Sequence, residues 1–187
     1  MTLAMIGGLH GASQGRHEEA LPYFEQAVAI ARERDDEMRE AHALSNMAIS
    51  YTGLGRFAES VEASRRAIEL RRGQNDRRSP AFNLDNLGDA YYEMGEYEQA
   101  ADAYAEALAI VRELGDSRGE AIYLANLTRA REQLIPSSDT QARAELTATA
   151  RRALEALASM PDTECQRVRD SLRKAFPDLD TVPKPSA

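Results

Sequence analysis

Three asparagines recur along the chain at intervals of forty residues. Asn46, Asn86 and Asn126 each lie in a segment with helical periodicity. A side-chain amide both donates and accepts hydrogen bonds, so a column of such amides can pair with the backbone of an extended peptide. The alternative is that each asparagine bonds to a neighbouring helix and holds the helices together. The spacing therefore predicts either a peptide-binding column or a structural one.

Three acidic residues share the segment that holds Asn86. Asp85, Asp89 and Glu93 lie at positions i, i+4 and i+8. Like charges at this spacing oppose a helix by about 0.2–0.5 kcal/mol per pair. A nearby cation would offset this cost, and Arg129, forty residues after Asp89, is an internal candidate that can reach Asp89 or Glu93. The alternatives are that water alone solvates the three carboxylates, or that a basic or amine-bearing ligand binds to them.

A second column at the same interval is mostly apolar. His42, Phe82 and Ile122 lie forty residues apart. They can form the apolar floor of a groove or pack between helices. Tyr92, next to Tyr91, is a candidate aromatic for the same groove.

No pattern of residues indicates catalysis. His10, His17 and His42 lack metal-ligand spacing to each other or to Cys165. The chain has no Gly-rich phosphate loop with a following lysine, and no serine lies in a nucleophile-elbow sequence. We therefore expect no enzymatic activity, no metal site and no cofactor.

The composition predicts one soluble helical domain. The chain has 187 residues, of which 43% are hydrophobic and 29% charged, and its net charge of −8 argues against direct binding to nucleic acid. The single cysteine excludes an internal disulfide and fits a reducing compartment. The first fifteen residues do not resemble a signal peptide, and no stretch approaches the roughly 18 apolar residues of a membrane span. We expect a cytoplasmic protein without membrane contact.

Glycines mark the period of the elements that carry these residues. Gly15, Gly55 and Gly95 lie forty apart, like the asparagines, and two ladders with one period indicate a repeat protein. Glycine can take the left-handed conformation that closes a helix, as expected at Gly55. A frayed first helix is expected before residue 15. The later helices are expected at residues 17–34, 38–53, 57–72, 80–94, 96–114, 117–134, from a cap at Ser137, Ser138 or Asp139 to about 159, and at 163–176.

The third repeat resembles the tetratricopeptide repeat (TPR) family. It carries the small and large apolar positions of that family at Leu84, Leu87, Gly88, Tyr91, Ala100, Tyr104 and Ala107. The first repeat keeps Phe24 at the aromatic position of the second helix, whereas the second repeat has Ser60 and Ser64 where alanine and an aromatic residue are expected. The fourth repeat keeps Leu124 and Leu127 and then diverges.

The resemblance implies an all-α, right-handed solenoid of antiparallel helix pairs, with about eight to nine helices including a C-terminal capping helix. One TPR domain is expected over residues 1–176, followed by a flexible tail over residues 177–187. Its repeats would span about residues 1–35, 38–73, 79–114 and 117–160, with the capping helix at 163–176.

The repeat of forty residues is longer than the usual TPR length of about 34. Together with the sequence LGDSRGEA at residues 114–121, it resembles the sensor repeats of actinobacterial antibiotic-regulatory (SARP-type) and related signal-transduction regulators. Repeats of cell-polarity adaptors and kinesin light chains are also similar. In such adaptors the corresponding asparagines bind the partner's backbone.

In a TPR stack the first helix of each pair lines the concave surface. The predicted concave-groove residues are His42, Asn46, Phe82, Asp85, Asn86, Asp89, Tyr92, Glu93, Asn126 and Arg129. The expected function is non-enzymatic: a regulatory module that binds a protein or peptide segment, which can be basic, or that senses a ligand. It would be the effector domain of a bacterial transcription regulator. The alternative is a scaffold that self-associates, for example as a homodimer, through its terminal repeats.

Overall fold

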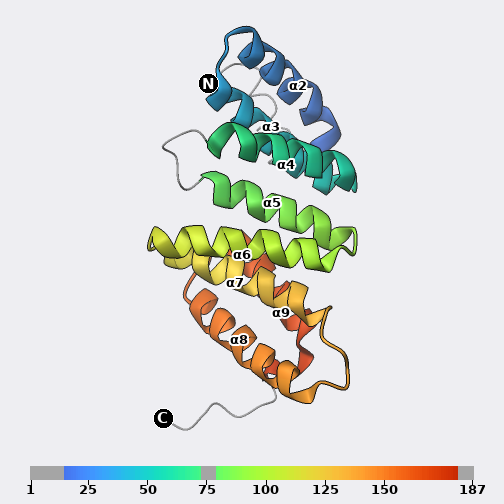
Figure 1. Ribbon diagram of the computed structural model, residues 1–187, viewed down its shortest axis with the longest axis vertical. Helices are drawn as coiled ribbons and strands as arrows, with labels where there is room; N and C mark the ends of the chain where they lie inside the picture. The colour runs from blue at the N-terminus through green and yellow to red at the C-terminus, as the bar shows by residue number, and fades with distance from the viewer. Residues whose placement is uncertain (1–14, 73–78, 181–187) are drawn as a thin grey trace. The chain divides into compact units, whose positions relative to one another are not determined.

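The computed structural model describes residues 15–72 and 79–180, and this part of the chain contains eight α-helices and no strand (Figure 1). The helices are α2 (His17–Glu33), α3 (Glu37–Gly53), α4 (Phe57–Arg72), α5 (Ser79–Glu93), α6 (Tyr97–Glu113), α7 (Ser117–Glu132), α8 (Thr140–Ala158) and α9 (Thr163–Ala175). The predicted all-α repeat architecture is confirmed. Each helix expected in these ranges lies within one or two residues of its predicted bounds.

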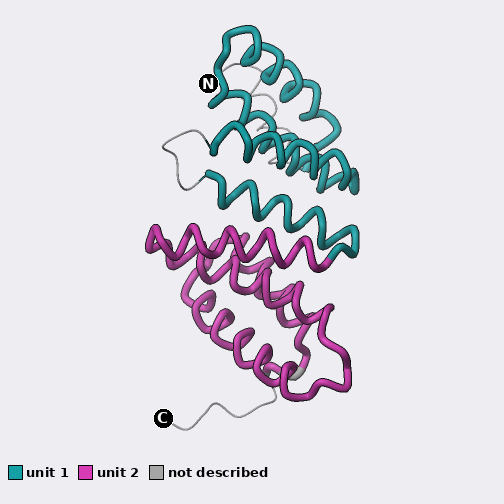
Figure 2. Tube along the Cα trace, in the orientation of Figure 1, with its two compact units in different colours: residues 1–96 teal, residues 97–187 magenta. Residues whose placement is uncertain are grey.

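The chain divides into two compact units, which are described separately (Figure 2). Unit 1 ends at Glu96 and contains α2 to α5, and unit 2 begins at Tyr97 and contains α6 to α9. The frayed helix expected before residue 15 lies outside the described residues. None of the described helices combines the length and the apolar character needed to cross a membrane.

The glycine ladder lies in left-handed turns. Gly15, Gly55 and Gly95 have φ values of 72°, 72° and 78°. In the α3–α4 turn the amide of Arg56 donates to the carbonyl of Tyr51 at 2.8 Å, which is the hydrogen bond of a Schellman helix end. The prediction that Gly55 closes a helix in this conformation is therefore confirmed.

The turns that precede the first helix of a pair have the same geometry, and one of them carries a strained residue. In the α2–α3 turn Asp35 has a positive φ of 51°, whereas the equivalent position in the α6–α7 turn is Gly115, with a φ of 65°. Both turns have the Schellman hydrogen bond at 2.9 Å, in which the Asp36 amide donates to the Ala31 carbonyl and the Asp116 amide donates to the Val111 carbonyl. This left-handed conformation is strained for a residue with a Cβ atom and not for glycine.

We therefore expect Asp35→Gly to raise the free energy of unfolding by about 0.5–1 kcal/mol. The reverse change, Gly115→Asp, should lower it by a similar amount, because a Cβ atom there would meet no other atom within 4 Å and would add only backbone strain. Urea denaturation followed by circular dichroism measures both variants. A destabilised Asp35→Gly would show that the aspartate stabilises its turn.

The contact between α3 and α4 explains one departure from the family pattern. Ala48 and Ala67 are fully buried, and small side chains allow the helices to approach closely. Ser60 replaces the expected alanine, and its hydroxyl donates to the Ala48 carbonyl at 3.0 Å and lies 2.8 Å from Thr52 Oγ1. Ser60 thus satisfies its polar group within the interface. Ser64, at the aromatic position, is also fully buried, but its hydroxyl has no partner among the described residues.

The C-terminal elements follow the sequence expectation at one point and differ from it at another. Of the three candidate caps for α8, Asp139 is the one used, accepting a hydrogen bond from the Ala142 amide at 3.0 Å. The tail was expected to be flexible from residue 177, yet Pro177–Asp180 form a 3-10 helix, η1, with Leu179 buried. A single apolar side chain extends the packed structure past the proline that ends α9. Residues 181–187 lie outside the described part.

Candidate functional site

In unit 1 the first helices of two consecutive repeats, α3 and α5, lie side by side. The two helices are in contact, and Ser45 Oγ of α3 lies 2.6 Å from Asn83 Oδ1 of α5. Ser45 and Asn83 are both buried. The neighbouring faces of the two helices are thereby brought together.

A solvent-accessible stripe runs along both helices. Its members lie three or four residues apart, which places them on one face of each helix. We define the unit 1 stripe as His42, Asn46 and Ile49 of α3 with Phe82, Asn86, Asp89 and Glu93 of α5. His42, Phe82 and Glu93 are exposed and the other members half-buried. Phe82, with 42% exposure, is one of the few large apolar side chains left in solvent.

The two asparagines of the stripe do not tie α3 to α5. Asn46 Nδ2 donates at 2.9 Å to the His42 carbonyl of its own helix. Asn86 Nδ2 is shielded from solvent and has no hydrogen-bond partner among the described residues. Neither asparagine therefore forms a hydrogen bond between α3 and α5 in the described part of unit 1.

The acidic residues of α5 are placed unequally. Asp85 is 6% exposed, Asp89 is half-buried and Glu93 is exposed. Asp85 occupies the position equivalent to Ser45 and lies two residues after Asn83, so it is on another side of α5 than the one that meets α3. Tyr92 is half-buried next to Tyr91, whose hydroxyl accepts a hydrogen bond from Arg65 at 2.5 Å.

In unit 2 the equivalent stripe of α7 is covered. Ile122 is 2% exposed and Asn126 is 6% exposed, and α9 packs against α7. Arg129 Nη1 donates to Ser171 Oγ of α9 at 2.7 Å, and its Nη2 lies 3.4 Å from the Tyr104 hydroxyl. The predicted ion pair of Arg129 with Asp89 or Glu93 would join the two units and stays a prediction.

Ion pairs hold the start of α9 to the start of α7. Arg118 Nη2 lies 3.0 Å from Asp162 and 2.5 Å from Glu164. Since Arg129, near the end of α7, bonds to the second half of α9, the two helices run in the same direction. An amphipathic helix therefore occupies the stripe of α7.

Electrostatics favours this arrangement at neutral pH. The hydrogen bond from Arg118 and that from the Cys165 amide hold the pKa of Asp162 well below its usual range, and burial raises the pKa of the Cys165 thiol. Because the pKa of Asp162 is lowered, its contribution to stability is complete above the ordinary carboxyl range of about 4 and is lost as the pH falls further.

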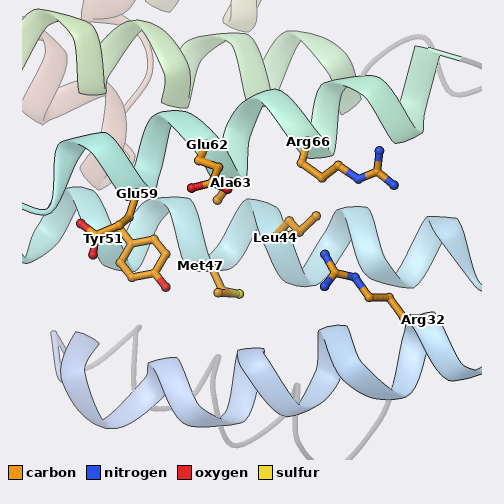
Figure 3. Close-up of a pocket in the computed structure, with 8 residues that line it drawn as sticks. All are labelled: Arg32, Leu44, Met47, Tyr51, Glu59, Glu62, Ala63 and Arg66. Atoms are coloured by element: carbon orange, nitrogen blue, oxygen red, sulfur yellow. The ribbon is translucent and has the colours of Figure 1, made fainter.

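A pocket with a volume of about 240 Å³ lies between α2, α3 and α4 of unit 1 (Figure 3). It opens on another side of α3 than the stripe. Its lining residues are Arg32, Leu44, Met47, Tyr51, Glu59, Glu62, Ala63 and Arg66. Among the described residues no group of three or more His, Cys, Asp or Glu side chains is placed to hold a metal ion.

None of the residues predicted from the sequence to form a binding site lines this pocket, although one signal was present. Arg32 donates to Glu40 at 2.9 Å, and the pair recurs eighty residues later as Arg112 and Glu120, at 2.8 Å. Arg66 has no such equivalent, because residues 26 and 106 are glutamine and glutamate. A basic residue found in one repeat only was the sign that this repeat differs.

Residues 1–73 and 78–134 match the tetratricopeptide repeat family, and the chain belongs to that family. No curated protein sequence matches the chain. Its fold is similar to those of several solved structures whose sequences are less than 20% identical to this chain. This fold is typical of non-enzymatic protein-interaction modules.

Three solved structures illustrate the similarity. A substituted form of the kinesin light chain TPR-like repeats from Podosopora anserina has a TM-score of 0.70 at 17% identity, covering 95% of this chain and 85% of the other. For the apo form of RapI the TM-score is 0.78 at 14% identity, with 95% of this chain and 63% of RapI covered. BtubC from P. vanneervenii gives 0.55 at 16% identity, covering 96% and 82%. The chain thus spans less than two thirds of RapI.

Proposed function

We propose that the chain is a non-enzymatic regulatory module that binds a helical protein segment along the unit 1 stripe. The observation that carries this proposal is the contrast between equivalent positions. Ile122 lies on α7 between Arg118 and Arg129, which both bond to α9, and is 2% exposed, whereas Phe82 in unit 1 is 42% exposed. The same repeat position therefore holds a helix in unit 2 and faces solvent in unit 1.

The side chains of the stripe define the partner's chemistry. Phe82 and Ile49 offer apolar surface, and the half-buried side chains of Asn46 and Asn86 lie at the centre of the stripe. Glu93 is exposed at one end. A partner helix with one apolar face and basic residues near Glu93 fits this pattern, since charge complementarity at the rim improves specificity and the rate of association.

The sequence features shared with SARP-type regulators support a place for the chain in bacterial transcription regulation. The forty-residue period and the LGDSRGEA sequence at residues 114–121 are the features concerned. In that role the bound segment would control a regulator, and DNA contact would be made by other parts of the assembly.

Selection from a displayed peptide library on the immobilised protein, followed by calorimetry with a selected peptide, tests the binding surface. Phe82→Ala is expected to weaken binding about tenfold or more, because a buried aromatic anchor commonly contributes over 1 kcal/mol. Asn46→Ala combined with Asn86→Ala should weaken it further. The matched control is Tyr23→Ala, since Tyr23 is an aromatic residue with 47% exposure on α2. Peptides that depend on Tyr23 and not on Phe82 would contradict the proposal.

The alternative, a self-associating scaffold, has its own observation. Tyr23 on α2, in the first repeat, and Met38 on α3, in the second, are exposed apolar side chains. Light scattering on the same samples over a concentration series decides this point. A monomer at all concentrations would exclude self-association.

A further inference from the structure

The pocket between α2, α3 and α4 has opposite charges toward its two ends (Figure 3). Arg32 and Arg66 lie at one end, and Glu59 and Glu62 lie toward the other. The surface between them is apolar, formed by Leu44, Met47 and Ala63. This arrangement is complementary to a small molecule with a carboxylate, an apolar middle and an ammonium group.

The two arginines are positioned by one buried carboxylate. Glu40 is 6% exposed, and its Oε1 lies 2.9 Å from Nε of Arg32 and 3.9 Å from Nε of Arg66. Nη1 of Arg66 also lies 3.2 Å from Glu69 Oε2. The terminal nitrogens of Arg32 and Nη2 of Arg66 have no acceptor among the described residues. Guanidinium groups held in this way can bind a second carboxylate in a fixed geometry.

The acidic end also has unused hydrogen-bonding capacity. Glu59 accepts from Arg56 through Oε1 alone, at 2.9 and 2.6 Å. Glu62 has no partner within the described ranges. The Tyr51 ring, with the Arg56 guanidinium 4.7 Å from its centroid, lines the pocket next to Glu59. An ammonium group placed here would meet two carboxylates.

The distance between the ends sets the size of the ligand. Glu62 and Glu59 precede Arg66 on α4 by four and seven residues, or by about 6 and 10 Å along the helix axis. The charged termini of an extended dipeptide lie at most about 7 Å apart. In a free amino acid the ammonium and carboxylate groups are attached to the same carbon, so they are too close together to reach both ends of the pocket. The pocket volume of about 240 Å³ is below the range of about 300–1,000 Å³ for drug-sized ligands and suits a dipeptide.

We propose that this pocket binds a zwitterionic ligand of dipeptide size. The ligand's carboxylate lies between Arg32 and Arg66, its ammonium group lies at Glu62 and Glu59, and its side chains pack on Leu44 and Met47. The site shares no residue with the unit 1 stripe, so it does not depend on the function proposed above. It gives the module a small-molecule site separate from its protein-binding surface.

Calorimetry of the full chain with L-alanyl-L-leucine at low salt tests the proposal. We expect a Kd of about 1 mM, which is typical for a ligand of about 14 non-hydrogen atoms. N-acetyl-alanyl-leucine, alanyl-leucine amide and free leucine should each bind at least about fivefold more weakly, because each loses one ionic contact or cannot span the pocket. Absence of binding at about 20 mM dipeptide, or equal binding of the blocked forms, would overturn the proposal.

Two pairs of variants locate the site. Arg66→Gln and Glu62→Gln are each expected to weaken dipeptide binding about fivefold. The charge-matched controls are Arg34→Gln and Glu33→Gln, since both residues are exposed near the end of α2 and do not line the pocket. Thermal unfolding by circular dichroism confirms that all four remain folded. Equal weakening by the controls, or unchanged binding in both pocket variants, would refute the assignment.

Discussion

Phe24→Ala is expected to lower the free energy of unfolding of unit 1 by about 3–5 kcal/mol. Phe24 has no exposed surface and is among the largest fully buried side chains of the described structure. Its truncation removes apolar contacts and leaves a cavity, which a close-packed interior fills only in part. Since most domains have a total stability of about 5–15 kcal/mol, this single change can leave unit 1 largely unfolded near 37 °C.

Urea denaturation followed by circular dichroism measures this effect. Tyr23→Ala is the control, because Tyr23 lies beside Phe24 in the sequence but is 47% exposed, and its loss should change stability by less than about 0.5 kcal/mol. If Phe24→Ala and Tyr23→Ala lowered the free energy of unfolding equally, Phe24 would not be buried and Tyr23 exposed as the structure describes.

Leu172→Asp is the second change with a large expected effect, and it acts on α9. Leu172 is 1% exposed. An unpaired carboxylate at this position costs several kcal/mol to bury, so α9 is expected to leave α7. Hydrogen exchange should then show lost protection in α9 and faster exchange in α7 near Ile122 and Asn126, while α2 to α5 keep their protection.

Arg167→Asp provides the matched control, because Arg167 is on the same helix but exposed. It should leave the exchange pattern of α9 unchanged. If Leu172→Asp also left it unchanged, α9 would not be held to α7 by its apolar face. If α9 is released as expected, the α7 stripe becomes accessible, and peptides selected on the unit 1 stripe can be tested for a second binding event.

Much of the fold was predictable because its determinants are local. Leu21, Phe24 and Val28 recur at the helical interval and identify a helix with one apolar face. Gly55 identifies a turn, because few other residues adopt its left-handed conformation without cost. Such features depend on residues close in the chain, so the helix bounds followed from the pattern to within one or two residues.

The candidate sites were less predictable, because they depend on residues distant in the chain. The forty-residue interval predicted that Asn46, Asn86 and Asn126 occupy equivalent positions. In the structure these three positions differ in solvent exposure. Asn46 and Asn86 are half-buried, while Asn126 is 6% exposed where α9 packs on α7. A repeat period cannot show that a later helix folds back on one repeat and not on another. Asp85 and Asp89 lie on one helix and also differ in exposure, since Asp85 is 6% exposed and Asp89 is half-buried.

The sequence by itself determined that this is a helical repeat protein of the TPR family, and where its helices begin and end. Periodicity and turn residues encode these properties within single elements. Only the tertiary structure decided which equivalent positions face solvent. It also brought Arg32, Glu40 and Arg66 from α2, α3 and α4 to one end of a pocket. Both the exposure of equivalent positions and the grouping of these three residues result from packing between helices. That packing depends on side chains from different repeats, and the spacing of residues within one repeat does not show which of them meet.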